Sequence, residues 1–504
     1  MFLNILFSAL FVLLLVGVVL VILFEEGDSG RKAAWLLIIT ILPVIGLVLY
    51  LMVGISYRYR WLYRIFHKPW LEAQAQLPEG RLKELFEGER SLAAVQEHWR
   101  SLVPLLATDD ANTVCGGNDV EIITDGRRKY DLLVRDLLAA KEYIHVEYYL
   151  FGKDPWSDGI RRILMQKARE GVKVRFIHEN IVNFDLCGKY WKEMADAGIE
   201  VLPFTNPRRH LLNFVTRLNY RDHRKIVVID GRTGYCGGMN IKARYFEGWR
   251  DTHLRVTGDA VLSLQSSFLS TWMTAGGTID REYGQFFPET GDAAALPEPG
   301  AEFRPARPGA DGTVVPHPVL KEVLVQVVPD EADNRWPITQ MGYVRAISLA
   351  REYIWLQTPY FVPTEPVLEA LKAAALSGVD VRLMVPFRTD APLMGPVNES
   401  FFSECLAAGI RIFRWKGGTF IHAKTFVCDD YLTMVGSANI DYRSFMINHE
   451  INTFLYDRPA ALQYKSIFLE DQEVSEEVTW DRWTQRSWFR KLRERIFRLF
   501  APLL

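Results

Sequence analysis

Two long apolar runs open the chain. Phe2 to Phe24 contains no charged residue, and Ala33 to Val53 is interrupted only by Thr40, Pro43 and Gly46. As a helix, either run is long enough to cross the hydrocarbon core of a bilayer. A cleaved signal peptide is the alternative for the first run, but that run lacks a basic start and a second apolar run follows at once. The pattern predicts a hairpin of two transmembrane helices.

Charged residues are distributed unevenly around these runs. Only Glu25 to Lys32 lies between them, whereas cations crowd just after the second run, at Arg58, Arg60, Arg64 and Lys68. Because cytoplasmic flanks of membrane spans carry the excess of Lys and Arg, we expect the short loop to face out and the main part of the chain to be cytoplasmic. Tyr57 to Trp70 alternates aromatics with cations, as membrane-interface belts do.

From Gly117 onward, strand-like and helix-like patterns alternate, and the order repeats. Glu142 to Ile144 and Glu352 to Ile354 open matching strands, and each is followed by a helix that ends in glycine, at Gly171 and Gly378. Repetition of one plan within a chain indicates a duplicated structural unit. We therefore predict two similar α/β halves.

Segments outside the two halves have distinct compositions. Leu71 to Asp110 is charged, with helical spacing, and is expected to be a connector without chemistry; Gln285 to Pro318 is rich in Pro, Ala and Gly, as linkers are. An additional piece of the first half, Thr205 to Leu218, is basic and amphipathic, so it fits either an anionic headgroup contact or a solvated loop.

The carboxyl end is basic and aromatic. Its apolar residues fall at helical spacing on one side, with arginines lateral or opposite: Trp488, Leu492, Ile496, Leu499 and Leu503, against Arg486, Arg490, Arg493 and Arg498. We expect an interfacial helix on an anionic membrane, with a helix packed on the protein as the alternative. The predicted organisation is 1–55 transmembrane helices, 56–115 juxtamembrane and helical connector, 116–283 first half, 284–318 linker, 319–475 second half and 476–504 basic amphipathic helix.

Overall composition argues against two classes of function. Lys and Arg number 59 against 61 Asp and Glu, a net charge of −2, so the global basic field of nucleic-acid-binding proteins is missing and no nucleic-acid partner is expected. The five cysteines are scattered without CxxC spacing, which disfavours a disulfide framework or a zinc site: Cys115, Cys187, Cys236, Cys405 and Cys428.

One polar motif occurs twice. Arg221 to Asn240 contains His223, Lys225 and Asp230, followed by a Gly-Gly-x-Asn turn. Ile421 to Asn439 repeats it, with the residues His422, Lys424 and Asp429 and then Gly436, Ser437 and Asn439. In an extended strand, alternate side chains share a face, so each copy presents an imidazole beside an ammonium. A single copy could be a solvated edge strand, but duplication makes that improbable.

This inventory suits phosphodiester exchange, which needs a nucleophile, a proton donor for the leaving oxygen and cations for the non-bridging oxygens. Two histidines supply the first two, while the lysines and the motif amides, Asn240 and Asn439, would hold phosphoryl oxygens. Ser437 replaces a glycine of the first copy and could add a hydroxyl to that set. Since the sequence has no HExxH and no close carboxylate or cysteine ligand set, no metal and no cofactor is expected.

Both segments resemble the HKD motifs of the phospholipase D superfamily, and the motif pair with two N-terminal spans resembles its bacterial cardiolipin synthase branch. The resemblance implies two phospholipase D-like α/β halves packed as a pseudo-dimer around one active site, preceded by a transmembrane hairpin in the bacterial inner membrane. It also implies a reaction. His223 would attack phosphatidylglycerol, expel glycerol and form a phosphatidyl-histidine, while His422 would transfer protons to glycerol and from a second phosphatidylglycerol. The order of the histidines follows family habit alone.

Four further carboxylates belong to the pattern. Asp251 follows His223 at the interval at which Glu450 follows His422, which fits a duplicated pair that orients the histidines, and the resemblance places the family's histidine-binding carboxylate there. Asp230 and Asp429 complete the motif's catalytic signature. Their odd interval places them near the turn, so ion pairing or turn hydrogen bonding is the expected task.

Other functions share parts of this pattern. A membrane phospholipase D, or a phosphatidyltransferase using another alcohol, would share the covalent step. A nuclease of the superfamily fits poorly with two spans and a near-neutral charge. A catalytically silent scaffold is disfavoured because both motifs keep every polar residue. The expected partners are therefore phosphatidylglycerol, anionic membrane lipids and the bilayer.

Overall fold

The computed structural model describes residues 2–24, 29–50, 54, 89–107, 112–183, 185–186, 188–204, 220–279, 283–288, 317–332, 334, 336–391, 394–499 and 501. The expectations for Tyr57 to Trp70, for Thr205 to Leu218, and for most of the connector and linker lie outside these residues.

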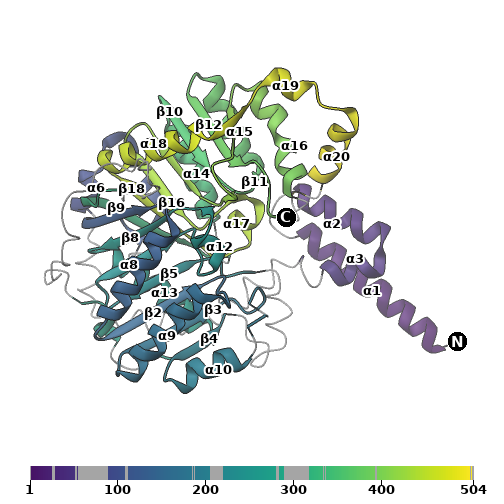
Figure 1. The fold of residues 1–504 in the computed structure, drawn as a ribbon. Coiled ribbons are helices and arrows are strands. Elements are labelled where there is room, and N and C mark those ends of the chain that lie inside the picture. Colours follow the sequence, from purple (N-terminus) through teal and green to yellow (C-terminus); the bar gives the residue numbers. More distant parts are fainter. Residues whose placement is uncertain are drawn as a thin grey trace.

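A single fifteen-stranded mixed sheet forms the body of the molecule (Figure 1). Its order is β19-β13-β12-β10-β15-β16-β18-β9-β1-β8-β6-β5-β2-β3-β4. The first half contributes β1 (Cys115–Ile123), β2 (Tyr143–Tyr148), β3 (Lys173–His178), β4 (Glu200–Pro203), β5 (Lys225–Ile229), β6 (Thr233–Gly237) and β8 (His253–Thr257). The second contributes β9 (Leu320–Asp330), β10 (Tyr353–Gln357), β12 (Asp380–Pro386), β13 (Arg411–Trp415), β15 (Thr425–Cys428), β16 (Leu432–Gly436), β18 (Glu450–Tyr456) and β19 (Ser475–Val478).

Counted outward from the centre of the sheet, the strands of the two halves follow in equivalent order. Only β19 has no counterpart among the described strands of the first half. The central strands β1 and β9 pair antiparallel, with Val120 opposite Leu320. Each then pairs antiparallel with β8 or β18, and the next strands follow in equivalent order. The predicted pair of α/β halves is therefore confirmed, and the two halves share one continuous sheet.

Helices cover both faces of the sheet. The first half has α8 (Gly126–Ala139), α9 (Pro155–Arg169), α10 (Gly188–Asp196), α12 (Ala243–Phe246) and α13 (Ala260–Thr274). The second has α14 (Ile338–Leu349), α15 (Glu365–Leu376), α16 (Met394–Ala407), α17 (Tyr442–Met446) and α18 (Arg458–Glu473). Several begin at an aspartate that accepts a backbone N–H, as N-caps do: Asp125, Asp154, Asp441 and Asp457.

One apolar core joins the halves. Phe268 and Trp272 of α13 belong to the same buried cluster as Tyr464 and Phe468 of α18. The other face has a separate core in each half, which in the second half includes side chains from α6 (Glu89–Ala94), the 3₁₀ turn Glu97–Trp99 and α7 (Leu102–Leu106). Because burial of apolar surface is the main driving force of association, the shared core fixes the two halves relative to each other.

The N-terminal helices differ from the predicted pair of spans. They are α1 (Phe2–Phe24), α2 (Ser29–Ile41) and α3 (Pro43–Leu49). The predicted second span, Ala33 to Val53, is interrupted at Leu42, whose φ of −129° and ψ of 72° are not helical. Proline disfavours the helical conformation of the residue before it and lacks an N–H, so the break occurs where Pro43 begins α3. Within the described part of the chain, no helix has both the length and the hydropathy needed to cross a bilayer.

The C-terminal segment forms α19 (Trp480–Thr484) and α20 (Trp488–Arg498), and α20 packs on α16. Two of its arginines are paired there, Arg490 with Glu399 at 2.7 Å and Arg498 with Glu404. Trp488 and Phe489 point outward, 65% and 77% exposed. The helix therefore turns much of its charged surface to the protein and its apolar surface outward.

Candidate active site

The two motif copies occupy equivalent places in the sheet. His223 and His422 lie just before β5 and β15 respectively, and Lys225 is the first residue of β5. Both histidines are buried, with 8% and 6% of their surface exposed. Short parallel pairings link the halves at this point, between β7 (Trp249–Arg250) and β14 (Phe420–Ile421) and between Asp222 and His449. The structure thus brings both motifs to the seam.

Each histidine is held by a carboxylate of the opposite half. His223 Nδ1 lies 3.0 Å from both carboxylate oxygens of Glu450, and His422 Nδ1 lies 2.7 Å from Asp251 Oδ2. The main chain crosses in the same way, because the N–H of His223 donates to His449 O at 2.9 Å. Equal intervals along the sequence could not show this exchange of partners between the halves.

The crossed pairs fix which nitrogen faces the substrate. A carboxylate bound at Nδ1 holds the proton on that nitrogen and leaves Nε2 with the lone pair. Burial lowers the pKa of His223, and it lowers the pKa of His422 well below its usual value, helped by Lys424, Lys225 and His223. Both imidazoles are therefore neutral bases in the free protein.

The two supporting carboxylates differ in pKa. Burial raises the pKa of Asp251 to about 6. Burial also acts to raise that of Glu450, but His223 and Lys225 outweigh it and bring the pKa to about 2, assisted by the hydroxyl of Ser437, which donates to Glu450. The equivalent residue, Gly238, has no room for a side chain, since a Cβ there would lie 2.1 Å from Asp251 Oδ1. The duplicated motif is thus chemically asymmetric.

The motif lysines lie beside the histidines. Lys225 Nζ donates to His223 O, and Lys424 Nζ lies 2.7 Å from Nδ1 and 3.0 Å from Nε2 of His422. Burial lowers the pKa of Lys225 to about 7 and that of Lys424 to about 8. A bound phosphate would restore their charge, because an adjacent anion favours the protonated amine.

The motif amides make contacts within the protein in both halves. Asn240 accepts the N–H of Leu150 at 3.0 Å and donates to the hydroxyl of Tyr245 at 2.7 Å. Asn439 donates one amide N–H to Asp441 at 3.0 Å, and an amide nitrogen carries a second N–H. Ser437 donates to Glu450, so all three residues have contacts that shape the site, and their contacts with a phosphate stay a prediction.

Arg250, which precedes Asp251 in the first half, contacts the second half. Its guanidinium lies 2.8 Å and 3.2 Å from the two oxygens of Asp471 on α18, and its carbonyl accepts the N–H of His422 at 2.6 Å. The next residue along the chain is Asp251. This bidentate pair therefore positions Asp251 against His422 across the seam.

Comparison with known proteins places the chain in a family. Residues 133–272 and 343–472 match the family described as "Cardiolipin synthase, PLD-like domain", and residues 10–54 match "Phospholipase D-nuclease N-terminal". The Major cardiolipin synthase ClsA of Bacillus subtilis (strain 168) is 34% identical over 99% of this chain and 99% of its own. Cardiolipin synthase 2 of Bacillus anthracis is 36% identical over 96% of this chain and 89% of its own.

The chain belongs to the cardiolipin synthase family. The resemblance inferred from the two motifs is therefore confirmed. Among solved structures, the phosphatidylserine synthase of Haemophilus influenzae Rd KW20 is similar in fold, with a TM-score of 0.54 at 15% identity, over 76% of this chain and 93% of that one. That likeness concerns the fold alone, and the two phospholipase D-like halves follow from the family match.

In this cardiolipin synthase family member, the motif aspartates lie away from the histidines. Asp230 and Asp429 follow the far ends of β5 and β15 with positive φ angles of 52° and 46°. Asp230 accepts the N–H groups of Lys141, Glu142 and Tyr143, each at 2.8 Å. Asp429 binds the equivalent N–H groups, at 2.7 to 2.9 Å. The two aspartates are therefore structural residues and not part of the catalytic set, and their bonds go to the start of a neighbouring strand instead of to their own turn.

Replacing Asp230 with Asn should weaken the fold more than the chemistry. The amide keeps one acceptor oxygen and loses the charge, so we expect the free energy of unfolding to fall by about 1–3 kcal/mol. Denaturant unfolding with a lipid-product assay on the folded fraction measures both effects. Loss of turnover in a variant of unchanged stability would contradict this assignment.

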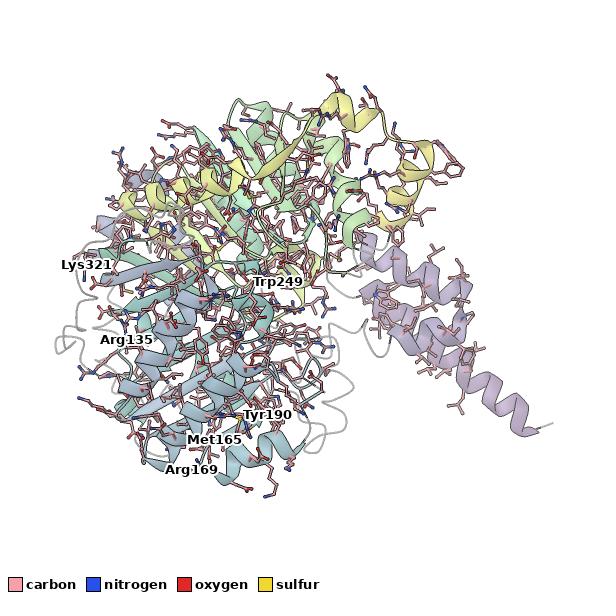
Figure 2. All side chains as sticks on the ribbon, viewed as in Figure 1. Arg135, Met165, Arg169, Tyr190, Trp249 and Lys321 are labelled. Carbon is pink, nitrogen blue, oxygen red and sulfur yellow. The ribbon has the colours of Figure 1, made fainter. Side chains whose placement is uncertain are left out.

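Aromatic rings pack against both histidines, and no pattern in the sequence indicated these contacts. Trp249 and Tyr245 pack on His422, with ring centroids 5.2 Å and 5.5 Å away, and Tyr149 meets His223 edge-on at 4.7 Å. Trp249 lies where the two halves meet (Figure 2). Trp249 and Tyr245 lie in a segment without any periodic signal.

Proposed function

We propose that this chain forms cardiolipin by transferring a phosphatidyl group from one phosphatidylglycerol to another, with release of glycerol. The observation that carries the proposal is a single seam at which two neutral imidazoles, each held by a carboxylate of the opposite half, stand with two buried lysines. Membership of the cardiolipin synthase family supports this proposal, because the match to a relative covers 99% of the chain.

The first half-reaction breaks the bond between phosphorus and glycerol. Nε2 of His223 attacks phosphorus, and the departing glycerol oxygen takes a proton from Nε2 of His422. His422 is neutral in the free protein, but a bound anionic phosphate raises its pKa and supplies the protonated form. Lys225 and Lys424 neutralise the non-bridging oxygens of the phosphoryl group.

The second half-reaction reverses the roles of the same groups. The terminal hydroxyl of a second phosphatidylglycerol gives its proton to His422, and its oxygen bonds to phosphorus as the bond to His223 breaks. The intermediate carries a positive imidazolium at His223, which the fully ionised Glu450 stabilises through Nδ1. The difference between Glu450 and Asp251 supports His223 as the nucleophile and His422 as the acid and base.

The reaction should have a bell-shaped pH dependence. Asp251 loses its charge below about 6, and with it the hold on His422, while Lys225 and Lys424 lose theirs above about 7 and about 8. We therefore expect kcat/KM, which reports the free enzyme, to be highest between about 6 and 7 and to fall on either side. Rates of cardiolipin formation at constant ionic strength measure it. A profile that stays flat through both limits would contradict these roles.

We infer that α1 to α3 insert into a bilayer and that α20 lies on its surface. Leu13 and Phe24 of α1 are 76% and 83% exposed, as are Trp488, Phe489 and Leu499 near α20 to similar degrees. Apolar surface of this extent marks a membrane or protein contact. Figure 1 shows α20 and α1 to α3 on one side of the body, so a single bilayer could meet both. The inferred location is the inner membrane, with the catalytic body in the cytoplasm.

Charging the outer face of α20 should weaken its surface contact. We expect a chain with Phe489 and Leu499 both replaced by Glu to keep its fold but to lose cardiolipin formation on vesicles more than in detergent micelles, by about tenfold in the ratio. Replacing Arg482 with Gln on α19 serves as the control. Equal rates in vesicles for variant and parent would argue against a bilayer contact here.

The product mixture tests the function itself. Purified full-length chain is incubated with phosphatidylglycerol in mixed micelles, and lipids and free glycerol are quantified. We expect one glycerol for each cardiolipin formed. Phosphatidic acid without cardiolipin would identify a hydrolase and end the transferase proposal.

A further inference from the structure

The two sides of the seam differ beyond the carboxylates. Each half carries an arginine at the fourth position after its motif asparagine, Arg244 and Arg443. Only the first half has an aromatic residue two positions before its carboxylate, Trp249, where the second half has Asn448. Asn448 instead donates to Glu450 at 3.2 Å. The site is thus built differently beside His422 and beside His223.

Arg244 lies on a platform against His422. Its guanidinium carbon is 4.2 Å from the centroid of the Trp249 ring and 5.6 Å from that of Tyr245. Both rings in turn pack on His422. A stacked guanidinium keeps its plane and its outward N–H groups available, the geometry that suits bidentate binding of a phosphate.

The charge of Arg244 is available to a ligand. Its side chain is exposed, and among the described residues it forms no ion pair with a carboxylate. By contrast, Arg250 is paired with Asp471, and Arg224 is paired with Glu147 at 2.9 Å. A cation held in this way beside a catalytic base points to an anionic group on the substrate.

The chemistry of the acceptor supplies that group. Under the proposed function, the hydroxyl that gives its proton to His422 belongs to a glycerol whose opposite end carries a second phosphodiester. A three-carbon bridge separates the two ends. Water and free glycerol, the competing acceptors, carry no such charge. A cation that is separated from His422 by about the length of one glycerol would therefore favour the lipid acceptor over water and free glycerol.

We propose that Arg244, stacked on Trp249, binds the phosphodiester of the acceptor phosphatidylglycerol and so determines that the phosphatidyl group passes to lipid rather than to a small alcohol or water. This inference rests on the proposed function and assigns the acceptor to the His422 side of the seam. Donor phosphate stays between the histidines and lysines. Arg244 therefore affects how the phosphatidyl-histidine intermediate divides between the lipid acceptor and the small acceptors.

A partition assay tests the proposal. Phosphatidylglycerol in mixed micelles is supplied with labelled glycerol, so that the common intermediate yields either cardiolipin or labelled phosphatidylglycerol. The measured quantity is the ratio of the two products. We expect R244Q to lower this ratio about tenfold, the size of one lost charge-assisted contact, and R244K to lie between R244Q and the parent, because lysine keeps the charge without the planar fork.

The control is R162Q, which changes a surface arginine of α9 whose side chain is 79% exposed, and it should keep the parent ratio. A ratio unchanged in R244Q, with both products reduced in proportion, would overturn the proposal in favour of a general attraction to anionic micelles. If R244Q forms neither product, R244K decides instead. A product ratio in R244K equal to that of the parent would then also overturn the proposal. A parent chain that forms labelled phosphatidylglycerol but no cardiolipin would refute the proposed function instead.

Discussion

Replacing His223 with Ala should abolish cardiolipin formation, with a fall in rate of about 10³-fold or more. The variant loses the atom that bonds to phosphorus, and no neighbouring side chain can substitute, since His422 is bound to Asp251 on the other side of the seam. The measurement is cardiolipin formed from phosphatidylglycerol by the purified, folded variant. His422 replaced by Ala should have a loss of similar size, because the first half-reaction needs it to give a proton and the second needs it to accept one.

His98 provides the matched control. Its ring contacts the carbonyl of Leu349 at 2.6 Å, in the connector region and far along the chain from either motif. H98A should therefore retain turnover. Unaltered cardiolipin formation by H223A would contradict the site and would favour a silent scaffold or a different active site.

Replacing either supporting carboxylate with its amide should lower turnover by about 10²- to 10³-fold. The amide cannot hold a proton on Nδ1 or balance a positive imidazole as the carboxylate does. For Glu450→Gln the loss should fall on the step that forms the covalent intermediate at His223, and for Asp251→Asn on the steps that move a proton through His422. Single-turnover release of glycerol, compared with steady-state cardiolipin formation, separates these two effects.

The crossing of partners can be tested in variants that have no activity. Double-mutant cycles on the free energy of unfolding should give coupling of about 1 kcal/mol or more for His223 with Glu450 and for His422 with Asp251. The same cycles for His223 with Asp251 and for His422 with Glu450 should give values near zero. Coupling within each half rather than between halves would contradict the crossed arrangement.

Much of this site could be predicted from the sequence because it depends on residues that are close together along the chain. The two-residue period of an extended segment predicted that His223 lies beside Lys225 and His422 beside Lys424, and the structure has both pairs at the starts of equivalent strands. The repeated strand and helix patterns likewise predicted two α/β halves. Local patterns survive in the structure because backbone geometry enforces them.

The remaining features depend on contacts between distant segments. Nothing in the intervals indicates that Glu450 reaches across to His223, because that pairing is set by the packing of one half on the other. The task of Asp230 becomes clear only when the backbone of Lys141 to Tyr143 lies beside it. Trp249 and Arg244 belong to a segment without periodicity, and their relation to His422 exists only in three dimensions.

The N-terminal and C-terminal segments show the same limit. The apolar run that starts at Ala33 predicted one helix, and the steric effect of Pro43 divides it in two. The helix near Trp488 was predicted from its spacing, but the pairing of Arg490 with Glu399 was not. Charged side chains that spacing assigned to lipid are used in part to attach the helix to α16.

Both histidines should act on one phosphorus atom. A crystal structure of the protein soaked with tungstate, an analogue of the transferring phosphoryl group, tests it most directly through the anomalous signal of the metal. We expect one anion per chain, within hydrogen-bond distance of Nε2 of both His223 and His422 and contacted by Lys225 and Lys424. Two anions in separate cavities, each on a single histidine, would contradict the account.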